Sequence, residues 1–136
     1  MGKAIINPPS LAQPRGFSHG ILVTGGMLLF LAGQTASDAE GQIVAQGNLV
    51  AQYEHTLRNL QTVVEAAGGK IQDIVKLTIF VRDRDSYMAQ LKALGNVHRT
   101  LFGNYYPAMA LFEVSRFYQD DALIEIEGMA VIGADE

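Results

Sequence analysis

The chain has 136 residues, a length typical of one domain that can bury one hydrophobic core. Hydrophobic residues make up 49% of the sequence and charged residues only 18%, a balance that is apolar for a monomer of this size and favours an oligomer. Because cysteine is absent, disulfides, thiolate metal sites and cysteine nucleophiles are excluded, and the net charge of −4 argues against a nucleic-acid-binding surface.

No apolar run is long enough to cross a bilayer, which takes about 18 residues. The longest such stretch, residues 27–32, is far shorter, and the N-terminus has no hydrophobic signal core before its first prolines. The sequence therefore predicts a single domain over residues 1–136, located in the cytoplasm.

The first half of the chain predicts an arm, two strands and a helix. Residues 1–16, rich in proline and asparagine, predict an extended arm. Residues 17–23 and 27–35 suit strands, with Thr24-Gly25-Gly26 as the hairpin turn between them. A helix should begin after an N-cap at Asn48 and end near Ala67. Its apolar stripe is Leu49, Tyr53, Leu57, Leu60, Val64 and Ala67, and its polar side is Gln52, Glu54, Arg58, Gln61 and Glu65.

The second half predicts a strand, a helix and two further strands. Residues 74–81 suit a strand, and Asp83 or Asp85 can cap a helix that ends at Gly103. The stripe of this helix is Tyr87, Leu91, Leu94, His98 and Leu101. Residues 107–116 and 122–132 suit the two arms of a C-terminal hairpin. This order predicts an α+β fold, with two helices on one face of a mixed sheet.

Side chains alternate across a strand, so the two arms of the expected hairpin define two sheet faces. One face is wholly apolar and suits a cover of helices: Ala108, Ala110, Phe112 and Val114 with Ile124, Ile126, Gly128, Ala130 and Ile132. The other mixes Met109, Leu111, Glu113 and Ser115 with Leu123, Glu125, Glu127, Met129 and Val131. Such a mixture is typical of a subunit interface that holds a polar pocket.

Candidate chemistry is concentrated in Glu125 and Glu127, which lie about 7 Å apart on one strand face. Partly buried beside Glu113, they could relay protons to water or substrate, whereas a solvated or ion-paired face would have no such role. Phosphate-binding loops and hydrolase or metalloprotease motifs are absent. The histidines lie in three separate elements without metal-ligand spacing, so each favours a structural role, and His19 is the strongest functional candidate among them.

With these elements in place, the chain resembles the Rid superfamily (YjgF, reactive intermediate deaminases) over nearly its whole length. No single motif is specific, but their order and spacing are. The matching motifs are Gly16-Phe-Ser-His-Gly20, Ala32-Gly-Gln34, Val64-Glu-Ala-Ala-Gly68, residues 73–81, Tyr106-Pro-Ala108, Glu113-Val114 and Ile124-Glu-Ile-Glu127.

The resemblance implies a chorismate-mutase-like fold, a homotrimer with a cleft between neighbouring subunits, and hydrolysis of 2-imino or enamine acids to 2-keto acids and ammonia without metal or organic cofactor. By the same resemblance, Glu125 would activate water and Phe17 would form an aromatic wall of the cleft. Backbone groups of Gly33 and Leu111 would contact the substrate. The position of the family's carboxylate-binding arginine is taken by Met109.

The methionine is a departure with a chemical consequence. A thioether cannot make the charge-assisted contact of a guanidinium with a carboxylate, so a small imino acid would lose about ten- to a hundredfold in affinity. Arg116 is expected on the opposite strand face and cannot take over this contact.

Three functions are compatible with this pattern. The first is a Rid-type hydrolase for a larger or less anionic imine or enamine. The second is a non-catalytic trimer that binds a small apolar or acidic metabolite. The third, an endoribonuclease, is disfavoured by the acidic charge and by the lack of a histidine pair or basic groove.

Overall fold

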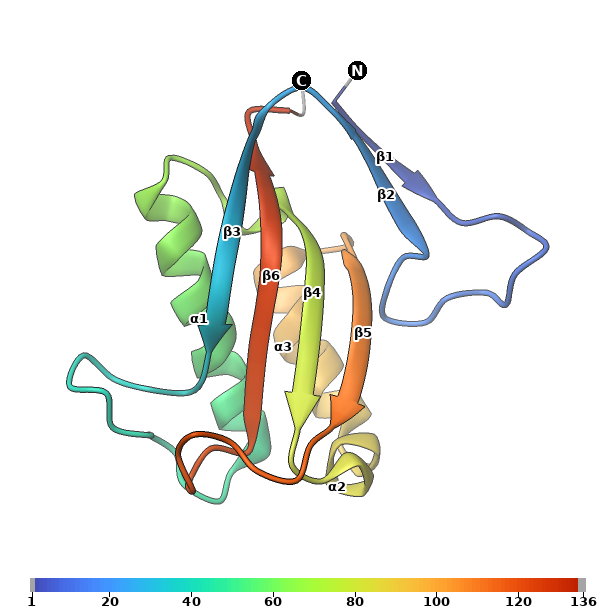
Figure 1. Cartoon of the computed structure of the whole chain (residues 1–136). Coiled ribbons are helices and arrows are strands. Elements are labelled where there is room, and N and C mark those ends of the chain that lie inside the picture. Colours follow the sequence, from blue (N-terminus) through green and yellow to red (C-terminus); the bar gives the residue numbers. More distant parts are fainter. Residues whose placement is uncertain (1, 135–136) are drawn as a thin grey trace.

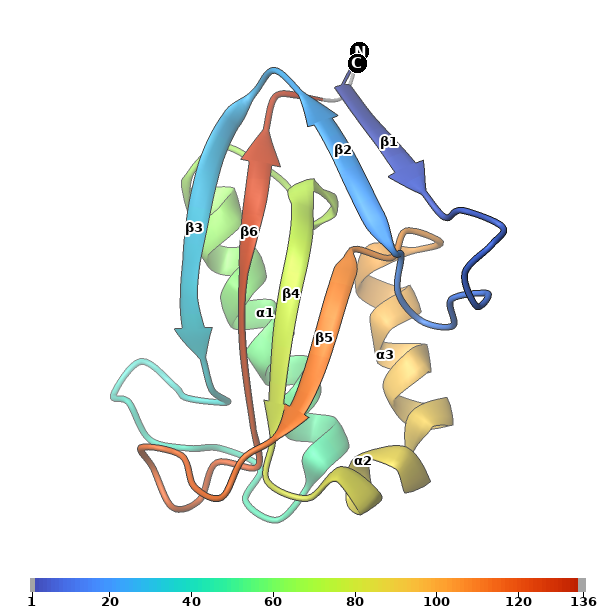
Figure 2. The same cartoon turned by 45° about the vertical axis from the view of Figure 1, so that its right-hand side comes forward.

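Runs of β-branched and apolar residues form a four-stranded sheet in the computed structural model, which describes residues 2–134 (Figure 1). Its strands are β3 (Met27–Gln34), β4 (Ile74–Val81), β5 (Ala108–Glu113) and β6 (Ile124–Ile132), in the order β3-β6-β4-β5. Helices α1 (Leu49–Ala66) and α3 (Leu91–Phe102) lie on one face of this sheet (Figure 2). Within residues 2–134 the other face carries no helix, which confirms the α+β architecture with helices on one side.

The expected C-terminal hairpin is wrong. β5 pairs in parallel with β4, and β4 pairs antiparallel with β6, so β4 separates the two strands that were expected to pair. Both segments are strands, as predicted. Both strands pair with β4, which lies more than 25 residues earlier in the chain. A local pattern in either arm cannot predict such a distant partner.

Because β5 pairs with β4, the side chains of β5 point to the opposite sheet faces from those expected. Met109 lies opposite Leu77, and Leu111 lies opposite Ile79; both β4 residues are buried beneath the helices. Met109 and Leu111 therefore face the helices, where they pack against the core. Phe112, expected in the core, is 53% exposed on the other face, where its ring stacks against Phe80.

The face assignment for β6 is confirmed. The residues that point towards the helices are buried, and the alternate set is more exposed. The buried set is Ile124, Ile126, Ala130 and Ile132. Glu125 and Glu127 consequently lie on the uncovered face, opposite Phe80 and Thr78 of β4.

The N-terminal segment forms a ribbon of its own. β1 (Gly2–Ile6), in the segment expected to be an extended arm, pairs antiparallel with β2 (Gly20–Thr24). The expected hairpin between residues 17–23 and 27–35 is wrong, because β2 and β3 belong to different sheets. Gly25 and Gly26, both at positive φ, turn the chain from the ribbon into β3 (Figure 1). Ser18, just before β2, bridges to Ala108 at the start of β5.

Helix α1 begins and ends close to the expected residues. The side chain of Asn48 accepts a hydrogen bond from the backbone of Ala51, which confirms the N-cap. The predicted apolar stripe is buried except for Ala67, which lies beyond the helix and is exposed. Gln52, expected on the polar side, is fully buried. No helix within residues 2–134 is long and apolar enough to span a membrane.

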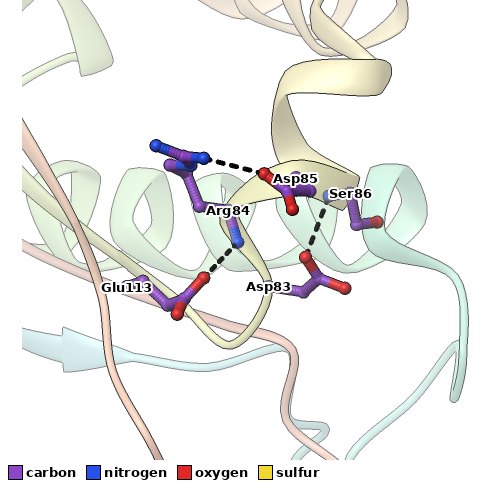
Figure 3. Close-up of polar contacts among 5 residues, drawn as sticks. All are labelled: Asp83, Arg84, Asp85, Ser86 and Glu113. Atoms are coloured by element: carbon purple, nitrogen blue, oxygen red, sulfur yellow. Dashed lines mark hydrogen bonds and ion pairs between the residues drawn. The ribbon is translucent and has the colours of Figure 1, made fainter.

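The second helical segment is divided at Gln90 into the short α2 (Arg84–Ala89) and α3. Asp83 caps α2 by accepting a hydrogen bond from the backbone of Ser86, as expected for one of the two candidate aspartates (Figure 3). Glu113, at the end of β5, accepts another from the backbone of Arg84 at 2.9 Å. The 3-10 turn η1 (Ile71–Asp73) connects α1 to β4.

Candidate functional site

The predicted site residues fall into two groups, and the first consists of Gly33 and Glu125. A β-carbon built on Gly33 would lie 2.2 Å from Oε2 of Glu125, so only glycine leaves room for the carboxylate against the β3 backbone. A register shift between Leu31 and Gln34 accompanies this approach. The resemblance singled out these two residues, and the fold brings them together across neighbouring strands.

Glu125 is half-buried on the uncovered face, opposite Phe80 of β4. Among residues 2–134 it has no hydrogen bond and no ion pair, so its oxygens remain available to a ligand or to water. Glu127, two residues along the same face, is exposed. The two carboxylates are therefore not equivalent.

Glu113 does not join them. It is paired with Val81 and thus lies towards the helices, where its carboxylate caps α2 (Figure 3). The expected association of Glu113 with Glu125 and Glu127 is wrong, because it assumed that β5 and β6 were neighbours.

The second group is Phe17, Met109 and Leu111, which line a cavity of about 560 Å³ between β5, α2, α3 and the segment before β2. All three side chains are half-buried. The fold thus brings Phe17, the expected aromatic wall, and Met109, where the resemblance leads us to expect an arginine, to one cavity. Arg116 does not contribute its guanidinium to this cavity, because it is exposed and forms an ion pair with Asp120 at 3.8 Å.

Within one chain the two groups do not converge. The strand register places Met109 and Leu111 on the helix face of the sheet and Glu125 on the uncovered face. A site that uses both groups must combine them from two copies of the chain.

The cavity is also lined by Tyr53 and Tyr87, which the sequence pattern placed only in the apolar stripes of the helices, and by Tyr106. Burial raises the pKa of Tyr53, and the nearby phenols of Tyr87 and Tyr106 raise it further. Burial also raises the pKa of Tyr87. All three line the cavity, and Tyr53 and Tyr87 keep their protons over the physiological range and can donate hydrogen bonds there. Helical periodicity could predict that Tyr53 and Tyr87 face the interior of the protein, but it could not predict that they line a cavity.

Each histidine is bonded to a backbone carbonyl. The Nε2 atom of His19 lies 2.7 Å from the oxygen of Ala12, and that of His55 lies 2.9 Å from the oxygen of Ser37. His98 is buried and its Nε2 donates to Tyr105 at 2.9 Å. Burial lowers the pKa of His98, and the charge of Arg99 adds to this effect. These contacts agree with the structural roles expected for all three.

No group of three or more histidine, aspartate or glutamate side chains within residues 2–134 is arranged to hold a metal ion.

Comparisons with known proteins place nearly the whole chain in one family. The family model described as Endoribonuclease L-PSP matches residues 9–132. A RutC family protein of Pyrococcus abyssi is 31% identical over 131 residues, covering 96% of this chain and 98% of that protein. A protein of Dermatophagoides farinae named 2-iminobutanoate/2-iminopropanoate deaminase is 30% identical, with 96% and 97% covered.

The fold agrees with that of a solved relative. The crystal structure of YyfB from Yersinia pestis, a Rid family protein of unknown function, superposes with a TM-score of 0.87 at 32% identity. The match covers 97% of this chain and all of that one. The mixed sheet with two helices on one face is therefore common to both.

Proposed function

The chain belongs to the Rid (YjgF) superfamily, which the Endoribonuclease L-PSP family model describes, and from this premise we propose that it hydrolyses a reactive imine or enamine in a cleft between two copies of itself. The products are a carbonyl compound and ammonia, and the reaction needs no metal or organic cofactor. The substrate differs from 2-iminopropanoate, because Met109 offers no charge to a small carboxylate.

The position of Glu125 carries this proposal. It is a half-buried carboxylate with no partner among residues 2–134, and it lies against the bare backbone of Gly33. A carboxylate so placed can orient a water molecule and accept its proton as the oxygen adds to the imine carbon. The carboxyl group then passes this proton to the nitrogen, which gives a carbinolamine. A second proton moves from the new hydroxyl group to the amino group through the same carboxylate. The carbon–nitrogen bond breaks, ammonia leaves and the carbonyl forms.

A homotrimer is the assembly that we propose for this cleft. The uncovered sheet face exposes Leu28, Phe30 and Met129 of β3 and β6, and Phe112 of β5. Phe30 is 71% exposed, which is unusual for phenylalanine on the surface of a monomer. Burial of this face against other copies would also bring Glu125 of one copy towards the Met109 side of the next. Sedimentation velocity should show a species of three chains, and a monomer at micromolar concentration would contradict the assembly.

Substitution of Glu125 tests the catalytic role. Imines generated in situ from a panel of amino acids by an amino-acid oxidase should disappear faster in the presence of the protein. Glu125→Gln should reduce this acceleration by about 10²–10⁴-fold, the usual contribution of an acid–base group. Glu127→Gln is the matched control, because it makes the same change on the same strand face at an exposed position and should retain activity. A panel with no acceleration over buffer would refute the hydrolase.

A non-catalytic metabolite-binding trimer is the second candidate, and Met109 is the observation that favours it. Ligand-dependent increases in melting temperature without turnover of any imine would support this function. The family model's name suggests a third, RNA cleavage, which the net charge of −4 disfavours. RNA degradation that elutes apart from the trimer would exclude it.

A further inference from the structure

The cavity beside β5 is lined by two charged side chains, Arg15 and Arg99, and by no carboxylate. Neither arginine has a carboxylate partner among residues 2–134, although three others do. Those pairs are Arg58 with Glu54, Arg84 with Asp85, and Arg116 with Asp120. The positive charge at the cavity is therefore not neutralised by the described part of the chain.

Arg99 is directed to the cavity by its own helix. Its guanidinium donates a hydrogen bond to the side chain of Asn96 and folds back over Gly95, whose built β-carbon would lie 3.3 Å from Nη1. Glycine inside a helix costs about 1 kcal/mol relative to alanine. At position 95 it leaves space for the guanidinium at the cavity wall, since Gly95 and Arg99 both line it.

The remaining polar groups of the cavity add donors and no negative charge. Tyr53 and Tyr87 are protonated phenols, as their raised pKa values require. His98 is held neutral by its lowered pKa, with the Nε2 proton engaged by the carbonyl of Tyr105. These donors and the two guanidinium groups would find suitable hydrogen-bond acceptors in an anionic or carbonyl oxygen of a ligand.

The rest of the wall is apolar, and the volume exceeds the needs of a small acid. Leu91, Leu94, Met109 and Leu111 are among the apolar residues that line it. At roughly 30 Å³ per heavy atom, a three-carbon imino acid would fill about a third of the 560 Å³ cavity. A ligand with an aromatic or long aliphatic body would bury its apolar surface against this wall.

We propose that this cavity binds carboxylates with an aromatic or long aliphatic body, and that Arg15 and Arg99 hold the carboxylate in place of the arginine that Met109 replaces. The apolar body lies against Met109 and the α3 leucines. This proposal rests on the proposed function in that it names the substrate class of the same cleft, a 2-imino acid with a bulky side chain.

Calorimetric titration of the full-length protein tests the site with 3-phenylpropanoate and its neutral counterpart 3-phenylpropanamide. The acid should bind more tightly than the amide, and added salt should weaken only the acid. Arg15→Gln and Arg99→Gln should each reduce the affinity for the acid by about tenfold or more and leave that for the amide unchanged. Arg116→Gln, an exposed arginine away from the cavity, is the matched control and should change neither.

Equal affinities for acid and amide, or unchanged affinity in both cavity variants, would overturn the proposal. Failure of the enzyme function gives a different result: binding that depends on both arginines, with no hydrolysis of any imine, supports the anion site and refutes the deaminase. Hydrolysis of aromatic 2-imino acids with the same KM in wild type and both arginine variants supports the deaminase and refutes the anion site.

Discussion

Gly33 leaves the space that the Glu125 carboxylate occupies. Because a β-carbon at position 33 would meet Oε2 at 2.2 Å, Gly33→Ala must displace the carboxylate. The displaced atoms are the end of a flexible, half-buried side chain, so the stability cost should stay below about 1 kcal/mol. Imine hydrolysis should nevertheless fall as far as in Glu125→Gln, and the double variant should lose no more than either single one. Additive losses would show that the two residues act separately.

Met109 stands where the resemblance to the family leads us to expect an arginine. Its side chain lines the cavity, so Met109→Arg would place a guanidinium there without opening a void. We expect kcat/KM for 2-iminopropanoate to increase by about ten- to a hundredfold, the value of a charge-assisted contact. Met109→Leu keeps the wall apolar and is the control. An equal rate for both variants would mean that the missing charge is not what limits small substrates.

His98 couples folding to pH. Burial between Phe102 and Tyr106 lowers its pKa, so the unfolded chain takes up a proton before the folded chain does. The free energy of unfolding should therefore fall as the pH drops through about 6.5, by at most about 1.4 kcal/mol per pH unit, and should be insensitive to His98 above that range. His98→Gln, which can still donate to Tyr105, should show a flatter dependence in urea denaturation between about pH 7.5 and 5.5. Identical slopes would contradict a depressed His98 pKa.

At the scale of elements, Gln52 ties α1 to the loop before β6. Its side-chain oxygen accepts a hydrogen bond from the backbone of Leu123 at 2.9 Å, and its nitrogen donates to the oxygen of Asp121 at 3.1 Å. Gln52→Ala would leave both backbone groups without these partners and should reduce the free energy of unfolding by about 1–3 kcal/mol, as measured in urea. Gln61→Ala on the same helix is the control and should change stability little. Equal effects would mean that the buried amide adds nothing beyond helix packing.

The sequence predicted elements better than their partners. The limits of α1 and β4 follow from caps and periodicity, which are local properties, and the structure confirms them. The partners of β2 and β5 depend on segments far away in the chain. In β5 both alternating sets contain apolar residues, Met109 and Leu111 on one side and Ala110 and Phe112 on the other, so polarity alone could not decide which set was buried.

At the scale of the molecule, the candidate site residues that the resemblance implied lie on opposite faces of one sheet. The alternation of side chains along β6 correctly predicted that Glu125 lies on the uncovered face. The same reasoning for β5 assigned its two faces the wrong way round, so it did not predict that Met109 lies on the helix face. The cavity with Arg15 and Arg99 was not predictable, because its lining residues come from the N-terminal segment, three helices and two strands that no local pattern brings together.

A site shared between copies makes a prediction that a site within one chain does not. In a closed ring, each cleft joins the Glu125 side of one copy to the Met109 side of its neighbour. Glu125→Gln disables the first side, and Met109→Glu disables the second by placing a negative charge in the wall of the cavity that takes an anionic substrate. Each variant alone should be inactive. Trimers reassembled from an equal mixture should regain roughly a quarter of the wild-type activity, because one cleft in four joins two intact sides. Circular dichroism of each variant checks that it is folded, and reassembly of wild-type chains alone controls for losses in the procedure. If the mixed trimers stay inactive while that control recovers, both groups of residues must act within a single chain, and the cleft between copies is not the catalytic site.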